Sequence, residues 1–489
     1  MKAEDVSSAV TIEKGYLGNL SPEQGTKLRE LWKLLLEAFE FDGSENDAGH
    51  ADAHTQAPRA APEPAEEDGA GTAAAASAAD HQVDLGERAR HRNNKEKKPR
   101  SSSTTRTSAT MITAAANAAA TSLQQSWLSM VKQENPDALL LRFLRARKWD
   151  VAQAFSMLRA ALLWRSQTAR VDEELLVKGE AWCVRIEKTG TTGTTDANAI
   201  STAGANTTST YTEKEKKDAH DYLQQFRMGK VYFRGADLRH RPIGYVQVAL
   251  HKPGAQSPET LEKLVVQVIE TARCLLDGTA KDGSFCVVFD LTGFSLSNME
   301  WGITKFIIQA FQANYPECLG TLLIHNAPWI FSGLWKIIRG LLDPVVAAKI
   351  NFTNSTKDLE KYIARENIIS RLGGGDTWTY TYHEPSADED ICITDSSSGE
   401  RERIMRQRGE IAERFLAATQ RWITHTVANE QDEAGKRAQL REAEIEALKR
   451  NYWELDPYVR SRTNIDRTGV IRPNGSIEMY PDRKTNDNK

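Results

Sequence analysis

Apolar runs of strand length alternate with amphipathic stretches of helical length between residues 225 and 375. Residues 285–291 and 321–325 are nearly all apolar, as strands that are covered on both faces must be. Three further runs complete the predicted strands, at residues 230–234, 243–248 and 350–353. Helical stretches at 258–276 and 298–313 lie between these strands, and the alternation predicts an α/β fold with a mixed, mainly parallel sheet.

The stretch after Pro328 carries two apolar stripes side by side when it is read as a helix. The stripes are Ile330, Leu334, Ile337, Leu341 and Phe331, Trp335, Ile338, Leu342. Together they are wider than the apolar face of an ordinary surface helix. One interpretation is a fully buried core helix, which the pattern alone favours. The other is a lid over an apolar cavity, which flexes at Gly333 and Gly340 and meets a membrane. Lys336 and Arg339 interrupt the run, so it cannot span a bilayer.

Charged residues end several apolar stripes, and each of them needs a partner if it is buried. In a short predicted helix, Lys349 lies on the same face as Val345 and Val346. Arg147 ends an apolar stripe in the same way, and Glu317 stands directly before a predicted buried strand. Two explanations remain open: an internal salt-bridge network, or a site for a bound anion.

The chain before the α/β region divides by composition into helical segments and low-complexity inserts. Residues 15–41 end in an amphipathic helix, and residues 122–188 contain three more helices. The inserts at 42–121 and 189–211 are poor in large apolar residues, so we expect them to be disordered. The first insert includes a basic patch at 87–100, which is most simply a solvated linker.

The chain after the predicted α/β domain, residues 222–376, is again helical. We expect two helices within residues 400–455 to pair antiparallel, to end at Pro457 and to pack on the α/β domain as a structural extension. Residues 456–489 form a tail in which the Pro-Asn-Gly triplet at 473–475 predicts a hairpin.

Bulk composition excludes several classes of function. The 63 basic and 67 acidic residues give a net charge of −4, which argues against a dedicated nucleic-acid binder. No apolar run reaches the ~18 residues of a membrane-spanning helix, and residues 1–20 lack the apolar core of a secretory signal. The five cysteines have no CxxC spacing, which fits a reducing cytosol better than a disulfide framework.

The sequence contains no recognisable enzyme signature. GxGxxG, Walker A, GxSxG and HExxH motifs are all missing, and the ten histidines form no cluster with metal-ligand spacing. Asp290 ends a predicted buried strand, a place where catalytic acids occur, but a carboxylate that orders the following loop is the more common case. We therefore expect no enzymatic activity, no cofactor and no metal.

Six motifs occur in order along the chain and together resemble one family. They are GYLGNLSPEQ at 15–24, LLRFLRARKWD at 140–150, VFDLTGFS at 288–295, NYPE at 314–317, HNAPW at 325–329 and LDPVVAAKI at 342–350. The chain resembles the CRAL-TRIO lipid-binding family, specifically the fungal phosphatidylinositol-transfer proteins, over residues 15–41 and 123–375. Its C-terminal extension is similar to that of one fungal subgroup, whereas the two inserts have no counterpart in the resemblance.

The resemblance implies a helical N-terminal subdomain and a lobe whose sheet floors a cavity for one whole lipid. It also implies three sets of site residues. The inositol headgroup would contact Arg147, Lys148, Glu317 and Lys349. A second lipid would contact Ser295 and Ser297, with Tyr232 and Tyr245 beside them. The gate helix would present Trp329, Phe331, Leu334, Trp335, Ile338 and Leu342.

The function that the resemblance implies is phosphatidylinositol transfer by a cytoplasmic, monomeric protein that associates peripherally with membranes. Two alternatives remain open: a sensor that presents the lipid to a lipid kinase, and an interaction scaffold with a vestigial pocket. Cys318, Val346 and Ala348 stand where family members carry basic or polar residues. The second ligand therefore stays open, and a more apolar lipid such as a sterol precursor is one candidate.

Overall fold

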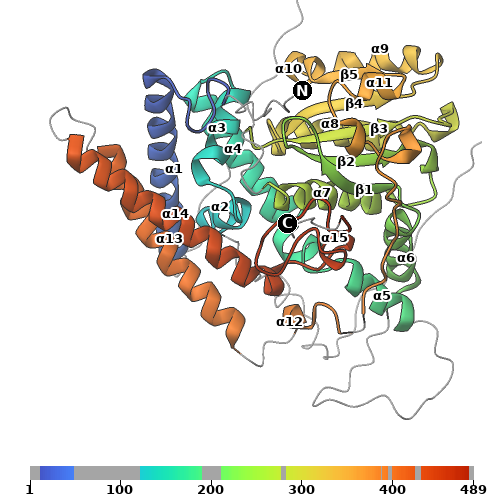
Figure 1. The fold of residues 1–489 in the computed structure, drawn as a ribbon. Helices are drawn as coiled ribbons and strands as arrows, with labels where there is room; N and C mark the ends of the chain where they lie inside the picture. The colour runs from blue at the N-terminus through green and yellow to red at the C-terminus, as the bar shows by residue number, and fades with distance from the viewer. Residues whose placement is uncertain are drawn as a thin grey trace, which may run out of the picture. The chain divides into compact units, whose positions relative to one another are not determined.

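A computed structural model describes residues 12–48, 122–189, 211–276, 282–386, 388–394, 399–424 and 431–483 (Figure 1). The insert predicted at 42–121 lies outside the described residues from position 49 onward. Most of the insert predicted at 189–211 lies outside them as well.

A five-stranded sheet in the order β1-β2-β3-β4-β5 forms the centre of the α/β lobe. The strands are β1 (Val231–Ala236), β2 (Pro242–Gln247), β3 (Phe285–Asp290), β4 (Leu319–His325) and β5 (Ile350–Thr353). β1 pairs antiparallel with β2, and the other three pairings are parallel. Every strand predicted from the apolar runs is present, and the prediction of a mixed, mainly parallel sheet is confirmed.

The parallel strands give the sheet two distinct ends. Gln247, Asp290, His325 and Thr353 pair in register at the carboxyl ends of β2 to β5. β1 runs in the opposite direction, so it begins at this same carboxyl end of the sheet. β3, β4 and β5 begin at the other end, the amino end of the sheet.

Helices cover one face of the sheet, and an irregular segment covers the other. On the first face lie α7 (Pro258–Cys274), α8 (Trp301–Gln309) and α9 (Phe331–Leu341). On the second face, α11 (Thr356–Leu359) and the chain up to Tyr380 pack on the sheet. The other helices of this part of the chain are α5 (Glu180–Thr189), α6 (Glu213–Arg227), α10 (Pro344–Ala348), α12 (Ile391–Thr394) and α15 (Asn464–Arg467).

The C-terminal helix pair packs on the N-terminal helices and shares their core. This helical subdomain consists of α1 (Pro22–Ala48), α2 (Leu123–Val131), α3 (Pro136–Ala146), α4 (Val151–Leu163), α13 (Glu400–Thr424) and α14 (Gln431–Val459). Trp32, Trp127 and Phe415 are fully buried at its centre, with the two indole rings 5.4 Å apart. Figure 1 shows α13 and α14 side by side next to α1. The prediction that this pair packs on the α/β domain holds only for the end of α14, where Trp453 packs in one cluster with Cys274. Most of the apolar stripe of the pair meets aromatic side chains of α1 and α2 instead.

The end of α14 and the chain after it contact the α/β lobe through apolar side chains, with Trp453, Ile465 and Ile471 in one cluster with Cys274. The antiparallel arrangement of α13 and α14 agrees with the prediction. Arg408 donates to the Leu448 carbonyl, and Arg414, which comes later on α13, donates to Glu444, which comes earlier on α14. Pro457 does not end α14. The Arg460 N–H donates to the Asp456 carbonyl at 3.0 Å, so hydrogen bonding continues across the proline, which removes only its own donor.

A buried carboxylate joins the helical subdomain to the α/β lobe. Glu270 of α7 has no exposed surface and accepts from Arg165 at 2.6 Å and from the Tyr315 hydroxyl at 2.7 Å. Lys132 and Arg273 lie 2.5 Å and 3.2 Å from its oxygens. Burial alone would raise the pKa of Glu270, but these cations hold it well below its ordinary value. The carboxylate is therefore ionised and fixes three segments around α7.

A second buried ion pair fastens the C-terminal helices to the N-terminal ones. Both guanidinium Nη atoms of Arg441 donate to Asp137, at 2.7 Å and 2.6 Å. The Trp32 indole donates to the same carboxylate at 2.7 Å, and the Arg441 guanidinium lies over the rings of Trp32 and Phe415. A bidentate pair of this kind leaves a buried charge when either partner is removed.

We expect Arg441→Ala to lower the free energy of unfolding by about 3–5 kcal/mol, because the buried Asp137 carboxylate loses its partner. Arg406→Ala, on the exposed side of α13, is the matched control and should change stability by less than about 0.5 kcal/mol. Urea denaturation followed by tryptophan fluorescence measures both values. Similar losses in the two variants would show that the pair does not hold the helices together.

Candidate functional site

An apolar cavity of about 300 Å³ lies between the sheet and the helices of its first face. Alternate residues of β1 to β5 form its floor, and α7, α8 and α9 form its walls. Representative lining residues are Val246, Val287, Phe289, Ile307, Leu322 and Ile350. Because almost all lining side chains are apolar, the cavity suits a hydrocarbon chain rather than a polar substrate.

Helix α9 uses one of its two apolar stripes to close this cavity. Phe331, Trp335, Ile338 and Leu342 line it. Within α9 only Phe331 is buried, so the interpretation of a fully buried core helix is wrong. Leu334 is half-buried and packs against the apolar cluster that contains Phe331 and Phe294. The helix is therefore a thin cover with cavity on one side and solvent on the other.

The second stripe of α9 leaves a large apolar surface in water. Ile337 and Leu341 are 55% and 43% exposed, and Trp329, which precedes the helix, is 86% exposed. Val345 and Phe352 extend this surface from α10 and β5, and both are more than two-fifths exposed. Contiguous exposed apolar surface marks a contact with a membrane or a partner. Among the described residues, no helix is long and apolar enough to cross a membrane.

The predicted pairing of Lys349 with a carboxylate is present at the amino end of the sheet. The Lys349 ammonium donates to Glu317 at 3.1 Å, and the two side chains are 21% and 12% exposed. Lys349 ends α10, and Glu317 occupies a left-handed turn before β4. The lining of the cavity includes Ile350, which follows Lys349 directly, and Leu319, two residues after Glu317. The pair therefore lies next to segments that line the cavity.

Arg147 and Lys148 end α3, where Arg147 is half-buried and Lys148 is exposed. The sequence did not single out Arg145, whose charge acts directly on Glu317. Burial lowers the pKa of Arg145, and the nearby Tyr16 and Glu317 oppose that shift. Its guanidinium lies 3.9 Å from the centre of the Tyr16 ring, and its buried Nε makes no hydrogen bond to any described residue. A further cation therefore lies near Glu317.

Ser295 and Ser297 follow β3 at the carboxyl end of the sheet, and their hydroxyl oxygens lie 2.7 Å apart. Both are exposed and lie between Phe294 and Asn298, which line the cavity. This places the two serines at the opposite end of the sheet from Lys349. Asn298 holds the loop by donating to the His251 carbonyl at 2.8 Å.

Tyr232 and Tyr245 do not lie with these serines at the cavity. They stack on each other on the opposite face of the sheet, 5.4 Å apart, in the core formed with residues 359–372. The prediction that they border the second-lipid pocket is wrong, because alternate strand residues point to opposite faces. Phe233 and Gly244, one position away on each strand, are the ones that line the cavity.

A buried chain of three titratable side chains also borders the carboxyl end of the cavity. The Lys230 ammonium donates to Gln225 at 2.7 Å and lies 2.9 Å from Nδ1 of His251, whose Nε2 is 3.0 Å from Glu300. An ammonium can only donate, so Nδ1 accepts and Nε2–H donates to Glu300. Lys230, His251 and Glu300 all line the cavity. The sequence did not indicate this cluster, since its members lie far apart along the chain.

Asp290 and the cysteines, which were also considered from the sequence, take no part in either end of the cavity as the structure describes it. Asp290 accepts from the Thr292 N–H at 2.9 Å and pairs with Arg371 at 2.5 Å, which orders the loop after β3. All five cysteines are free, and four of them are buried. Among the described residues, no group of three or more His, Cys, Asp or Glu side chains could hold a metal ion.

An apolar cavity with polar groups at both ends, closed by an amphipathic helix, defines a lipid-binding protein. The CRAL/TRIO domain matches residues 226–374, and the CRAL/TRIO N-terminal domain matches residues 97–160. The CRAL-TRIO domain-containing protein C3H8.02 of Schizosaccharomyces pombe is 37% identical over 356 residues, which cover 73% of this chain and 70% of that protein. The chain belongs to the CRAL-TRIO domain family.

Two further proteins are similar to this chain. Phosphatidylinositol transfer protein CSR1 of Eremothecium gossypii is 34% identical over 352 residues, which cover 72% of this chain and 72% of that protein. The crystal structure of Sfh5 is 17% identical, covers 50% of this chain and 73% of that one, and superposes with a TM-score of 0.34.

Burial lowers the pKa of Lys230 to about 8, against about 10.4 in an unfolded chain. As the pH rises from 8 to 10, the native state loses this proton first, so the contribution of Lys230 to stability rises. We expect Lys230→Met to be more stable than the wild type at pH 7. This advantage should shrink above pH 8 by up to about 1.4 kcal/mol per pH unit.

Urea denaturation at pH 7 and pH 9.5 measures this difference. Lys252→Met is the matched control, because Lys252 is exposed and only one residue from His251. The stability difference between Lys252→Met and the wild type should not change with pH. The same pH dependence in both variants would contradict the assignment of a perturbed lysine to position 230.

Proposed function

We propose that this protein binds phosphatidylinositol with its acyl chains in the apolar cavity and exchanges it between membranes. The observation that supports this most strongly is the Lys349–Glu317 pair next to segments that line an apolar cavity. The relative named phosphatidylinositol transfer protein CSR1 supports the same ligand.

The groups at the amino end of the cavity suit an inositol phosphodiester. A phosphodiester carries one negative charge, and Lys349 and Arg145 are cations that can form charge-assisted hydrogen bonds to it. Arg147 and Lys148 extend this positive group along the end of α3. Glu317 accepts hydrogen bonds, so it can bind inositol hydroxyls while it holds Lys349 in place. A choline headgroup has no hydroxyls to donate to that carboxylate.

The exposed stripe of α9 suits the step in which lipid enters and leaves. A free lipid crosses water slowly, because each exposed CH₂ group costs about 0.8 kcal/mol. When α9 moves away from the cavity at a bilayer surface, its cavity-facing stripe passes from protein into lipid, and apolar surface stays covered throughout. Gly333 and Gly340 lie on the exposed side of this helix and lower its intrinsic stability by about 1 kcal/mol each relative to alanine.

Lys349→Ala tests the headgroup assignment. We expect at least a tenfold loss in the rate of phosphatidylinositol transfer between vesicles, because the phosphodiester loses a charge-assisted hydrogen bond worth about 1.5–3 kcal/mol. Phosphatidylcholine transfer should fall less. Lys361→Ala, an exposed lysine beyond β5, is the control and should transfer both lipids at the wild-type rate. Undiminished phosphatidylinositol transfer by Lys349→Ala would remove Lys349 from the site.

Ile337→Asp tests the membrane contact without touching the cavity lining. We expect binding to phosphatidylcholine vesicles to weaken at least tenfold and lipid exchange to slow, since one buried isoleucine contributes about 1.5–3 kcal/mol. Leu440→Asp is the matched control, because Leu440 is 65% exposed on α14 in the helical subdomain. Vesicle flotation and a fluorescent-lipid exchange assay measure the two effects. Equal behaviour of the two variants would place the membrane contact elsewhere.

A further inference from the structure

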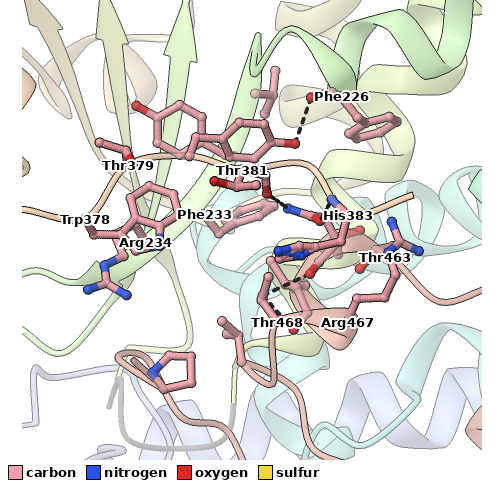
Figure 2. A pocket seen from close by; sticks show the side chains of 18 of the residues that line it. Phe226, Phe233, Arg234, Trp378, Thr379, Thr381, His383, Thr463, Arg467 and Thr468 are labelled. Carbon is pink, nitrogen blue, oxygen red and sulfur yellow. Dashed lines mark hydrogen bonds between the residues drawn. The ribbon is translucent and has the colours of Figure 1, made fainter. Parts of the chain in front are cut away.

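A second and larger cavity lies where the C-terminal extension meets the α/β lobe. This extension cleft measures about 710 Å³ and is walled by β1, by residues 377–383 and by residues 463–482 (Figure 2). The last two segments lie outside residues 226–374, the range that the CRAL/TRIO domain matches. The cleft is therefore a feature that the C-terminal extension adds to the lipid-binding lobe.

The extension cleft and the apolar cavity share one wall. Val231, Phe233 and Val268 line both of them. Figure 2 shows the Phe233 ring among the side chains that face the cleft. The two cavities are thus adjacent, and three apolar side chains border both of them.

The wall that the two cavities share also contains main-chain hydrogen-bonding groups, which belong to β1. β1 is an edge strand, since it pairs only with β2. The Gln247 N–H donates to the Lys230 carbonyl at 2.9 Å, so Lys230 directs its main-chain groups toward β2. By the alternation of an antiparallel pair, Val231 and Phe233 direct theirs away from β2. Further along the edge, the Ala236 N–H is already taken by the Tyr480 hydroxyl at 3.1 Å.

The cations in the walls of the extension cleft are already neutralised by carboxylates. Arg234 pairs with Asp376 at 2.8 Å and with Asp482. Arg467 pairs with Glu180 and, at 2.6 Å, with Glu389. An anionic ligand would lose hydration without gaining an unpaired cation, which costs several kcal/mol. The charge pattern therefore argues against a phosphate headgroup and is compatible with a neutral ligand.

The rest of the lining is aromatic on one side and hydroxylated on the other. Phe226, Phe233, Trp378 and Tyr380 offer ring faces and edges, which pack well against a flat or cyclic molecule. Thr377, Thr379 and Thr381 alternate with aromatic residues along an extended segment and are exposed to solvent. Their hydroxyl groups can both donate and accept hydrogen bonds.

We propose that the extension cleft is a second binding site, for an uncharged ring-containing molecule that carries one or more hydrogen-bonding oxygen atoms. Its rings pack against Phe233 and Trp378, and its oxygen atoms bond to the free edge of β1 and to the threonine hydroxyls. The site is distinct from the lipid cavity and does not depend on phosphatidylinositol transfer.

Titration with prodan, an uncharged naphthalene ketone, tests this proposal on the full chain. The anionic dye 1-anilinonaphthalene-8-sulfonate, also a substituted naphthalene, serves as competitor. We expect wild-type protein to bind prodan at one site and the anionic dye to compete poorly. Thr381→Trp, which fills the cleft, should weaken prodan binding at least tenfold, and Thr379→Trp should do the same. Thr424→Trp, at an exposed threonine of α13, is the matched control and should bind prodan as the wild type does.

Two further measurements separate the extension cleft from the lipid cavity. Prodan should slow hydrogen exchange of the Val231 and Phe233 amides, because it occupies the free edge of β1. Ile338→Trp, which fills the lipid cavity, should leave prodan binding unchanged, whereas Thr381→Trp should leave vesicle-to-vesicle lipid exchange unchanged. Prodan binding that survives both threonine variants, or that is lost in Ile338→Trp instead, would overturn the proposal. Failure of lipid transfer alone would leave it intact.

Discussion

The buried carboxylate of Glu270 is the point on which the rest of the architecture depends. It lies on α7, a wall of the lipid cavity, and binds Lys132 and Arg165 from the helical subdomain. It also accepts from Tyr315, two residues before Glu317. Desolvating one carboxylate and several cations is costly, and only a nearly complete set of partners offsets that cost. Small rearrangements of the helices would leave charges unpaired, so α7 and Glu317 are held in one relative position.

Within that frame the cavity is an apolar space between two polar ends. Lys349, Glu317 and Arg145 gather at the amino end of the sheet, where β4 and β5 begin. Lys230, His251 and Glu300 gather at the carboxyl end, beside the loop that carries Ser295. A bound amphiphile can therefore satisfy a polar group at either end while its chains remain in the middle. The length of the strands sets the distance between these two groups of polar side chains.

The sequence was informative where one local period decides the structure. Two near-continuous apolar runs and three less apolar ones identified all five strands, and the stripe that ends at Lys349 indicated a cation that needs a protein carboxylate or a bound anion as its partner. It was less informative where the outcome depends on tertiary packing. The two stripes of α9 are equally apolar, so periodicity could not tell which one faces the cavity. The resemblance implies that Tyr232 and Tyr245 lie beside a second lipid, but a shift of one residue reverses the direction of a strand side chain, and both lie on the other face of the sheet. Lys230, His251 and Glu300 are brought together only by the fold.

The uncovered stripe of α9 also has a cost when no membrane is near. Trp329, Ile337 and Leu341 would associate with any similar surface in solution, including the same stripe on another copy. Self-association depends on the square of concentration, whereas capture by an abundant bilayer depends only on its first power. Self-association should therefore be weak when the protein is dilute relative to the membrane area. Purification at high concentration should require detergent or lipid to keep the protein monomeric. The exposed apolar surface therefore makes self-association at high concentration the main hazard for this chain.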